Sequence, residues 1–183
     1  MMKIRRATPE DIEQIVSIYD RIHDEEETGS VTIGWDRAIY PTRKTAEDSL
    51  MRNDLFVMEE EGVIIASAII NQVQVPEYSL AAWKHEAPED EVMVLHTLTV
   101  DPSRKAKGYG KAFVACYEEY AREHNCCYLR LDTNFINTRA RKMYAGLGYE
   151  EIGIVNCVFN GIEGVRLVCL EKYLKDTEED RLR

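Results

Sequence analysis

Apolar residues along this chain follow two spacings, which predict helices and strands in mixed order. Helical spacing predicts helices over about 8–27, 46–52, 107–124 and a stretch that begins after Asn137. Apolar and β-branched runs predict strands at 2–7, 55–60, 63–74, 91–100, 127–132, about 149–159 and about 164–170. The predicted order, β-α-α-β-β-β-α-β-α-β-β, is a mixed α/β arrangement in which strands outnumber helices.

Short polar residues mark where these helices are expected to begin. Thr8 precedes a proline and two acidic residues, which is typical of a helix cap. Thr45 is expected to start the second helix, and Asn137 is expected to cap the last one. The stretch 29–41 is predicted as a loop, and the stretch 76–90, with two prolines and many charges, as a second loop or a short helix.

Length and organisation indicate one domain. The chain has 183 residues and a mass of 21.1 kDa, without an internal repeat or a linker rich in proline and glycine. A chain of this size buries roughly 70% of the surface that it exposes when unfolded, which is enough for a stable core without disulfides or bound metals. We therefore expect a single domain over 1–183, with a core at about 2–172 and a charged tail at 173–183.

Composition argues against several classes of protein. No apolar run approaches the roughly 20 residues that span a bilayer, and the first residues do not resemble a secretory signal. We therefore expect a cytoplasmic protein without a membrane partner. The net charge of −10 argues against nucleic acid as a partner. The five cysteines are an odd number, and the adjacent Cys126 and Cys127 lack a histidine at ligand spacing, so neither a disulfide framework nor a metal site is expected.

One basic segment stands out in this acidic chain. Four of the eight residues at 104–111 are basic. A predicted strand ends just before this segment at Asp101-Pro102, and a predicted helix begins within it. Backbone N–H groups and the positive end of the helix dipole would therefore converge on one point, where Gly108 and Gly110 allow close approach. The sequence thus predicts an anion site.

Known nucleotide motifs do not fit this segment. A P-loop requires Ser or Thr after its Gly-Lys pair, and this chain has Ala112. A dinucleotide fingerprint requires a third glycine where this chain has Phe113. A bare Gly-x-Gly is weak evidence, so the segment is either an anion site or simply a helix start with a basic face.

The segment resembles motif A of the GNAT superfamily, the GCN5-related N-acetyltransferases. In that motif a strand ends in Val, followed by Asp-Pro and then Arg/Gln-x-x-Gly-x-Gly/Ala. This chain has Val100, Asp101-Pro102 and the stretch 105–110, KAKGYG, in which Lys105 replaces the usual Arg or Gln. Residues 129–153 resemble motif B of the same superfamily, with Asn137, Tyr144 and the stretch 147–149, LGY. The resemblance covers roughly residues 2–172.

This resemblance implies a fold and a cosubstrate. The GNAT fold is an α/β (α+β) fold with a mixed, mostly antiparallel sheet of about seven strands and about four flanking helices, splayed between the fourth and fifth strands. The resemblance implies acetyl-coenzyme A as cosubstrate and no metal. The residues expected to bind it are Leu98, Thr99, Val100, Arg104, Lys105, Ala106, Lys107, Gly108, Tyr109, Gly110, Lys111 and Asn137. A backbone N–H near Leu98 is expected to face the thioester carbonyl. The family usually kinks this strand with a bulge, so alternation does not fix which atoms point toward the ligand.

Two side chains are candidates for the general base. In strict alternation His96 lies on the predicted strand face that carries Val94, Leu98 and Val100, and histidine titrates near neutral pH. The run 95–100, LHTLTV, also resembles the corresponding strand of arylalkylamine N-acetyltransferases, which makes His96 the first choice. Asp132 ends the neighbouring strand and is the rival, although it requires burial to become a useful base. Water alone is a third possibility.

Tyr144 is the candidate acid. It matches the motif-B tyrosine that protonates the coenzyme A thiolate, and a phenol with a pKa near 10 keeps its proton at pH 7. Its spacing from Ala140 also allows a purely structural position on the core face of a helix.

The expected reaction moves the acetyl group of acetyl-coenzyme A to a primary amine by direct attack in a ternary complex. A small amine, aromatic or a polyamine, is preferred as acceptor, because the chain is acidic and the two loops carry Trp35, Tyr40, Tyr78 and Trp83. Two alternatives stay open: a protein or peptide N-acetyltransferase, and a non-catalytic acyl-coenzyme A binding module. A homodimer also stays open.

Overall fold

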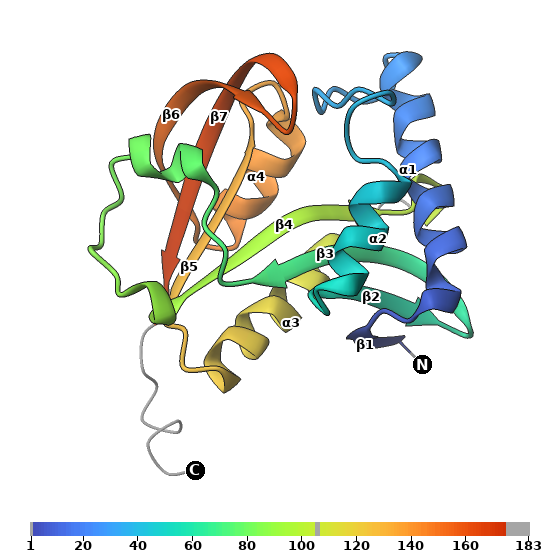
Figure 1. The fold of residues 1–183 in the computed structure, drawn as a ribbon, viewed down its shortest axis with the longest axis horizontal. Coiled ribbons are helices and arrows are strands. Elements are labelled where there is room, and N and C mark those ends of the chain that lie inside the picture. The colour runs from blue at the N-terminus through green and yellow to red at the C-terminus, as the bar shows by residue number, and fades with distance from the viewer. Residues whose placement is uncertain (1, 105–106, 175–183) are drawn as a thin grey trace.

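The computed structural model describes residues 2–104 and 107–174. Its centre is a seven-stranded sheet in the order β1-β2-β3-β4-β5-β7-β6 (Figure 1). The strands are β1 (Met2–Arg6), β2 (Leu55–Glu60), β3 (Val63–Asn71), β4 (Val92–Val100), β5 (Tyr128–Asn134), β6 (Glu150–Phe159) and β7 (Ile162–Tyr173). β4 and β5 pair in parallel, whereas the other described neighbours are antiparallel. The predicted mixed, mostly antiparallel sheet is confirmed.

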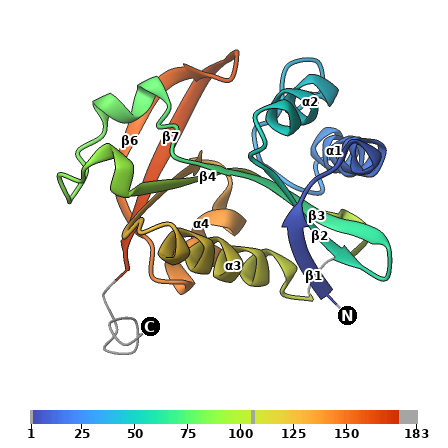
Figure 2. The ribbon, with the colours of Figure 1, turned by 60° about the horizontal axis from the view of Figure 1, so that its bottom comes forward.

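Helices cover both faces of this sheet (Figure 2). The α-helices of the described residues are α1 (Ile12–Glu27), α2 (Arg43–Met51), α3 (Tyr109–Glu123) and α4 (Thr138–Gly146). Helices α1 and α2 pack on β2 and β3 through a core that includes Ile15 and Ile18. Helix α3 packs on the opposite face through Phe113 and Tyr117. Each fully buried side chain of this size stabilises the fold by about 1.5–3 kcal/mol. No helix in the described ranges is long and apolar enough to cross a membrane.

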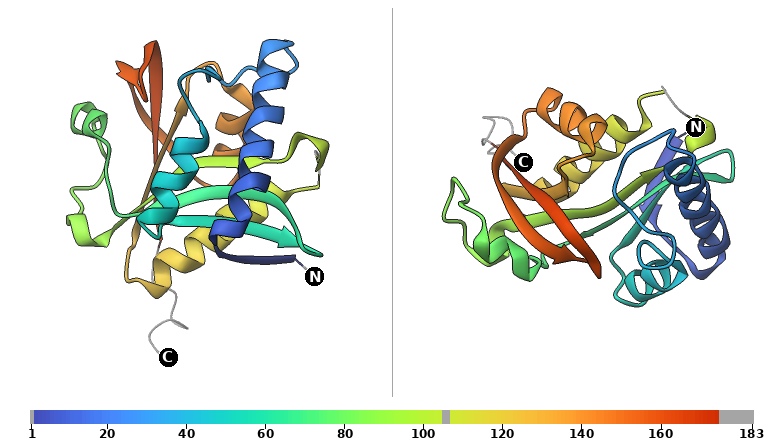
Figure 3. Two further views of the ribbon diagram at one scale, coloured as in Figure 1. Left: turned by 45° about the vertical axis from the view of Figure 1, so that its right-hand side comes forward. Right: turned by 90° about the horizontal axis from the view of Figure 1, so that it is seen from above.

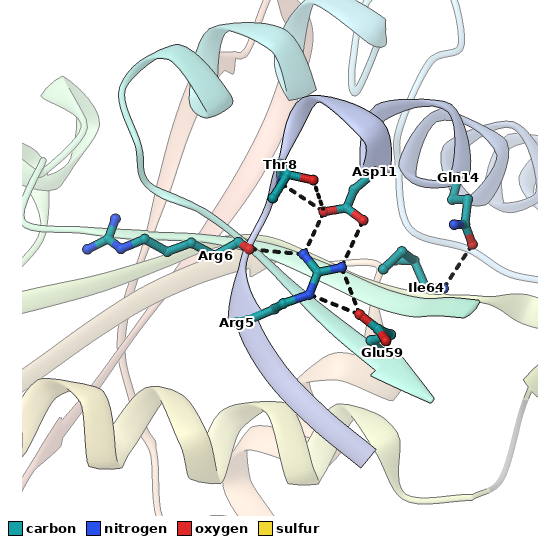
Figure 4. Close-up of polar contacts among 7 residues, drawn as sticks. All are labelled: Arg5, Arg6, Thr8, Asp11, Gln14, Glu59 and Ile64. Atoms are coloured by element: carbon teal, nitrogen blue, oxygen red, sulfur yellow. Dashed lines mark hydrogen bonds and ion pairs between the residues drawn. The ribbon is translucent and has the colours of Figure 1, made fainter. Parts of the chain in front are cut away.

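The start of α1 is tied to the sheet by charge (Figure 4). Asp11 accepts a hydrogen bond from the backbone N–H of Thr8 at 2.8 Å, which closes the first turn as a cap. The Arg5 guanidinium donates to both Asp11 oxygens, at 2.6 and 2.9 Å, and to Glu59 on β2. The predicted cap at Thr8 is therefore confirmed, and a three-residue turn at Pro9–Asp11 precedes the α-helix.

The second helix begins earlier than predicted. Thr42 rather than Thr45 is its cap, because the Thr45 hydroxyl reaches back to accept from the Thr42 N–H at 3.0 Å. Thr45 thus serves as the third residue of a capping box that lies one turn upstream. The predicted cap at Asn137 is confirmed, since its side chain accepts from the Ala140 N–H.

Strands β4 and β5 separate partway along their length. Their parallel register runs from Val92 opposite Tyr128 to Leu95 opposite Leu131. Beyond those residues β4 stays paired with β3 as far as Val100, and β5 stays paired with β7 as far as Asn134. The half that contains β5, β6 and β7 therefore turns away from the half that contains β1 to β4 (Figure 3). This is the predicted splay between the fourth and fifth strands.

A β-bulge in β4 separates His96 from the face that carries Leu98 and Val100. Ile69 of β3 pairs with His96, but Ser67 pairs with Thr99, so β4 carries one extra residue between these pairs. Thr97 has a φ of 50°, a left-handed value that strains a β-branched residue. Leu98 and Val100 consequently pack with the core under α3. Strict alternation was wrong beyond this point, because the bulge reverses the faces.

Candidate active site

A cavity of about 670 Å³ opens where β4 and β5 separate. It is lined by every predicted site residue that the structure describes: His96, Leu98, Thr99, Val100, Arg104, Lys107, Gly108, Tyr109, Gly110, Lys111, Asp132, Asn137 and Tyr144. The predicted binding residues Lys105 and Ala106 lie outside the described residues. Residues far apart in the chain, from β4, β5, α3 and α4, thus share one space large enough for a small-molecule ligand.

One end of the cavity, the predicted anion end, is formed by the residues at the start of α3. Gly108 caps α3 with a φ of 77°, a left-handed conformation that favours glycine. The Ala112 N–H donates to the Gly108 carbonyl, so the N–H groups of Tyr109, Gly110 and Lys111 precede the first helical bond. A Cβ on Gly108 would point into open space. This open space, beside amides at a helix N-terminus, suits a phosphate group.

The turn that precedes this end of the cavity is anchored to α1. No local sequence pattern predicted this contact. Asp101 is 6% exposed, and the Arg21 guanidinium donates to both of its oxygens at 3.1 and 2.9 Å. Asp101 also accepts from the Ser103 N–H at 2.9 Å. The chain between β4 and the anion end is therefore held by an ion pair from another layer of the fold.

Arg104 was expected to support the anion, but its nearest charged partner in the structure is acidic. Its Nη1 lies 3.6 Å from Glu60, and the Tyr109 hydroxyl donates to the same carboxylate at 3.0 Å. The side chain is only partly buried and lies at the rim of the cavity. Its guanidinium would have to leave Glu60 to contact a bound phosphate.

The middle of the cavity is formed by the bulge in β4. The register with β3 skips Thr97 and Leu98, so the backbone groups there have no paired residue on β3. The Thr97 side chain shares a hydrogen bond with the Tyr40 hydroxyl, and Tyr40 also lines the cavity. Burial raises the pKa of Tyr40 to about 12, so its hydroxyl stays protonated. An unpaired stretch of strand beside a cavity can present backbone donors to a ligand.

His96 is half-buried and weakly basic. Its Nε2 lies 3.0 Å from Asn71 Oδ1, an oxygen that also accepts from the Val73 N–H. Since that oxygen is an acceptor, Nε2 carries the proton. Burial lowers the pKa of His96 to about 4, although Asp54 and the Val73 backbone oppose the change. The imidazole is therefore neutral at pH 7, and its affinity for a proton is low.

The pKa of Asp132 is shifted in the direction opposite to that of His96. The Tyr78 hydroxyl donates to Oδ2 at 2.7 Å, and no described residue hydrogen-bonds Oδ1. Burial raises the pKa of Asp132 to about 7, against the lowering effect of the Tyr78 hydrogen bond. The side chain is half-buried, and desolvation there brings the pKa of the carboxyl group close to neutral.

Tyr144 completes the group around the splay. It projects from α4, is 6% exposed and packs edge-on against Tyr149 at 5.7 Å between ring centroids. Burial and the nearby Asp132 raise its pKa above that of an ordinary tyrosine. Its hydroxyl is therefore protonated at neutral pH and can donate.

The aromatic residues of the two loops have separate positions. Trp35 and Tyr40 line the cavity, together with apolar residues of β7 such as Val165 and Leu167. Tyr78 and Trp83 were expected beside the acceptor but lie behind Asp132, packed with each other at 4.9 Å. The contact of Tyr78 with Asp132 joins residues 54 apart in sequence, and no local pattern indicates it.

Comparison with known proteins agrees with this geometry. The acetyltransferase (GNAT) family matches residues 13–149. An uncharacterised N-acetyltransferase of Bacillus subtilis, YhfO, is 26% identical over 87% of this chain and 97% of its own length. An uncharacterised N-acetyltransferase of Methanocaldococcus jannaschii is 25% identical over 83% of this chain, which spans 62% of that protein's length.

Solved structures share the fold at low sequence identity. A GNAT acetyltransferase from Streptococcus agalactiae superposes with a TM-score of 0.79 at 22% identity, over 96% of each chain. YncA of Salmonella typhimurium, a putative acetyltransferase solved with its cofactor acetyl-CoA, has a TM-score of 0.67 at 16% identity, over 97% of this chain and 96% of its own. With the family match over most of its length, this chain belongs to the acetyltransferase (GNAT) family.

Proposed function

We propose that the protein transfers the acetyl group of acetyl-coenzyme A to the primary amine of a small molecule, by direct attack in a ternary complex. The observation that carries this proposal is the juxtaposition of an anion-binding helix end and two titratable side chains in one cavity. Family membership and the naming of acetyl-CoA as the cofactor of YncA support the donor.

The anion end would hold the pyrophosphate of coenzyme A. The amides at the start of α3 supply hydrogen-bond donors, and Lys107 and Lys111 at the same end of the cavity supply positive charge. The pantetheine arm would then run along the bulged part of β4, where an unpaired backbone N–H can stabilise the oxyanion. Such a donor contributes about 3–4 kcal/mol to lowering a barrier.

Transfer requires one proton to leave the amine and one to reach sulfur. The amine nitrogen forms a bond to the carbonyl carbon, the carbon–sulfur bond breaks, and the departing thiolate accepts a proton. Tyr144 suits the role of donor, because its raised pKa keeps the hydroxyl protonated until the thiolate forms. Solvent then restores the proton to Tyr144.

For the base, the electrostatics favour Asp132 over His96. A base works best when its pKa lies near the operating pH. The pKa of Asp132 is raised to about 7, whereas that of His96 is lowered to about 4. A carboxylate also attracts the ammonium form of the acceptor into the cavity. We therefore assign the proton from the amine to Asp132 Oδ1.

The acceptor side favours a small amine with an apolar body. Trp35 and Tyr40 stand on one wall, and Val165 and Leu167 on the opposite strand. Apolar and aromatic walls around a few polar groups are typical of small-molecule sites. An aromatic face can also bind the ammonium group by roughly 0.5–2 kcal/mol.

Competition kinetics test this proposal. The rate constant kcat/KM is measured for butylamine, 2-phenylethylamine, spermidine and a peptide with a free α-amine, from pH 5.5 to 9, in wild type, His96→Ala and Asp132→Asn. We expect a small amine to be preferred and the acidic limb near pH 7 to vanish in Asp132→Asn alone. A peptide preference of about tenfold or more would overturn the small-amine assignment. Loss of the limb in His96→Ala alone would return the base to His96, and absence of turnover with bound coenzyme A would indicate a binding module.

A further inference from the structure

The segment between β3 and β4 reaches across the sheet and contacts the proposed base. Residues 72–91 cover the sheet face that carries the core around Val92 and Val94 of β4 and Leu167 of β7. Within this segment Tyr78 lies in a short helical turn, Pro76–Leu80, and is 2% exposed. Its hydroxyl is the described donor to Asp132, at 2.7 Å.

Tyr78 is itself held in place by a buried polar group. The Trp83 indole N–H donates to the Tyr78 carbonyl at 2.8 Å. The Arg130 guanidinium stacks on the Trp83 ring at 4.1 Å from its centroid. Arg130 is 5% exposed and donates to the Gln74 side chain at 2.6 Å and to the His85 carbonyl at 2.9 Å. Both ends of the covering segment are therefore fixed to β5.

Alternation along β5 explains why Arg130 and Asp132 both contact the covering segment. Arg130 and Asp132 are two residues apart on one strand, so their side chains project from the same face. Glu171 on β7 pairs with Arg130 in the sheet register and lies 3.4 Å from its guanidinium. The buried charge of Arg130 is thus compensated, and it orients the segment that delivers the Tyr78 hydroxyl.

We propose that Tyr78 is a positioning residue for acetyl transfer: its hydroxyl holds Oδ2 of Asp132 and leaves Oδ1 free to accept the proton of the amine. This inference rests on the proposed role of Asp132 as base. Tyr78 does not line the cavity and touches the reaction only through the carboxylate. The hydrogen bond also favours the ionised form of Asp132, which is the form that a base requires.

Other titratable groups surround the same carboxylate. Those with an electrostatic effect on Asp132, or an effect from it, are Glu77, Tyr40, Tyr144, Cys157 and Cys169. Glu77 raises the pKa of Asp132 by repulsion, so it opposes Tyr78. The hydroxyls of Tyr40 and Tyr144 stay protonated because their own pKa values are raised. Of the interactions resolved for Asp132, the Tyr78 hydrogen bond favours the charged form.

The test compares Tyr78→Phe with wild type across pH. The acidic limb of kcat/KM for 2-phenylethylamine should move upward by about one to two pH units, the size expected for a hydrogen bond to an ionised group. The plateau value of kcat/KM at high pH should fall much less than kcat/KM falls at the pH values of the acidic limb. Tyr117→Phe is the matched control, because it also removes a buried hydroxyl, which donates to the Met93 carbonyl under α3. It should lose stability without moving the limb.

A second readout does not depend on catalysis. Carboxyl NMR of isotope-labelled aspartate, with the Asp132 signal assigned by its loss in Asp132→Asn, follows the titration directly in wild type and Tyr78→Phe. An unshifted titration in the folded variant would overturn the role of Tyr78. A shifted titration with an unmoved kinetic limb would keep the contact but overturn Asp132 as the base. If Tyr78→Phe does not fold, Trp83→Phe, which removes the hydrogen bond to the Tyr78 carbonyl, should give a smaller shift of the same sign, and no shift would count against the proposal.

Discussion

Gly108 offers a direct test of the anion end, because one substitution changes affinity and stability by different mechanisms. In the free protein its Cβ position is open space, so Gly108→Val should create no clash. Its φ of 77° is nevertheless left-handed, and a side chain there costs about 1–2 kcal/mol. In a chain of this size that corresponds to a fall in Tm of about 2–8 °C.

The effect on ligand binding should be much larger. Coenzyme A at about 100 times its Kd stabilises the folded state by about 2.7 kcal/mol, or roughly 5–10 °C in Tm. The valine side chain would occupy the space beside the amides of α3, so we expect this ligand-dependent rise to disappear. The measurement is the melting temperature by scanning fluorimetry, with and without coenzyme A, supported by calorimetric titration.

Gly62 supplies a matched control. It has a φ of 80° and open space at its Cβ position, but it lies in the turn between β2 and β3 and does not line the cavity. Gly62→Val should therefore lose similar stability and keep the full rise with coenzyme A. If Gly108→Val also keeps the rise, the anion end has been placed wrongly. If both variants lose it, the loss is not local to the site.

Three further predictions concern the acid, the anchor of the cofactor turn and the stability of the site. Tyr144→Phe should lower kcat on the order of 100-fold with the Kd of coenzyme A nearly unchanged, and wild-type turnover would leave Tyr144 a core residue. Arg21→Gln frees Asp101 and should raise the KM for acetyl-coenzyme A several-fold while kcat falls less; a selective fall in kcat would contradict this anchoring role. The folded pKa of Asp132 is raised to about 7, so its burial disfavours folding increasingly as pH rises from about 4 to 7. Asp132→Asn should therefore raise Tm more at pH 8 than at pH 5, and an equal change at both values would contradict a buried carboxylate.

The sequence predicted those parts of the site that depend on neighbouring residues. The cap at Asn137 and the loop around Gly108 follow from short local patterns, and the structure has both at the expected positions. The cap of α2 was displaced by one turn, because Thr42 and Thr45 both fit the pattern and only backbone geometry chooses between them. The local sequence thus predicted that α2 exists, whereas the residue at which it begins depends on the backbone geometry.

The parts that were missed depend on the arrangement of distant segments. Alternation along β4 ends at Thr97, since a single inserted residue reverses every later side chain; the family resemblance implies such a bulge, but the composition of the strand does not show its position. The preference for His96 over Asp132 rested on the ordinary pKa of histidine and on the resemblance of the run 95–100 to arylalkylamine N-acetyltransferases. Burial moves the two in opposite directions, because it disfavours the charged form of each. The sequence named both residues, but their relative basicity is a property of the folded environment.

The splay between β4 and β5 connects these observations. Where two parallel strands part, the sheet loses paired backbone and gains a space that side chains from both halves can enter. Asp132 lies just beyond Leu131, the last residue of β5 that pairs with β4, and it lines this space. It is nevertheless half-buried, because residues 72–91 cover the face behind it. A carboxyl group with a pKa near neutrality therefore requires both features: the opening that gives a proton access and the covering segment that excludes water. Changes in the covering segment should alter the pH dependence of the enzyme even when every residue of the cavity is unchanged.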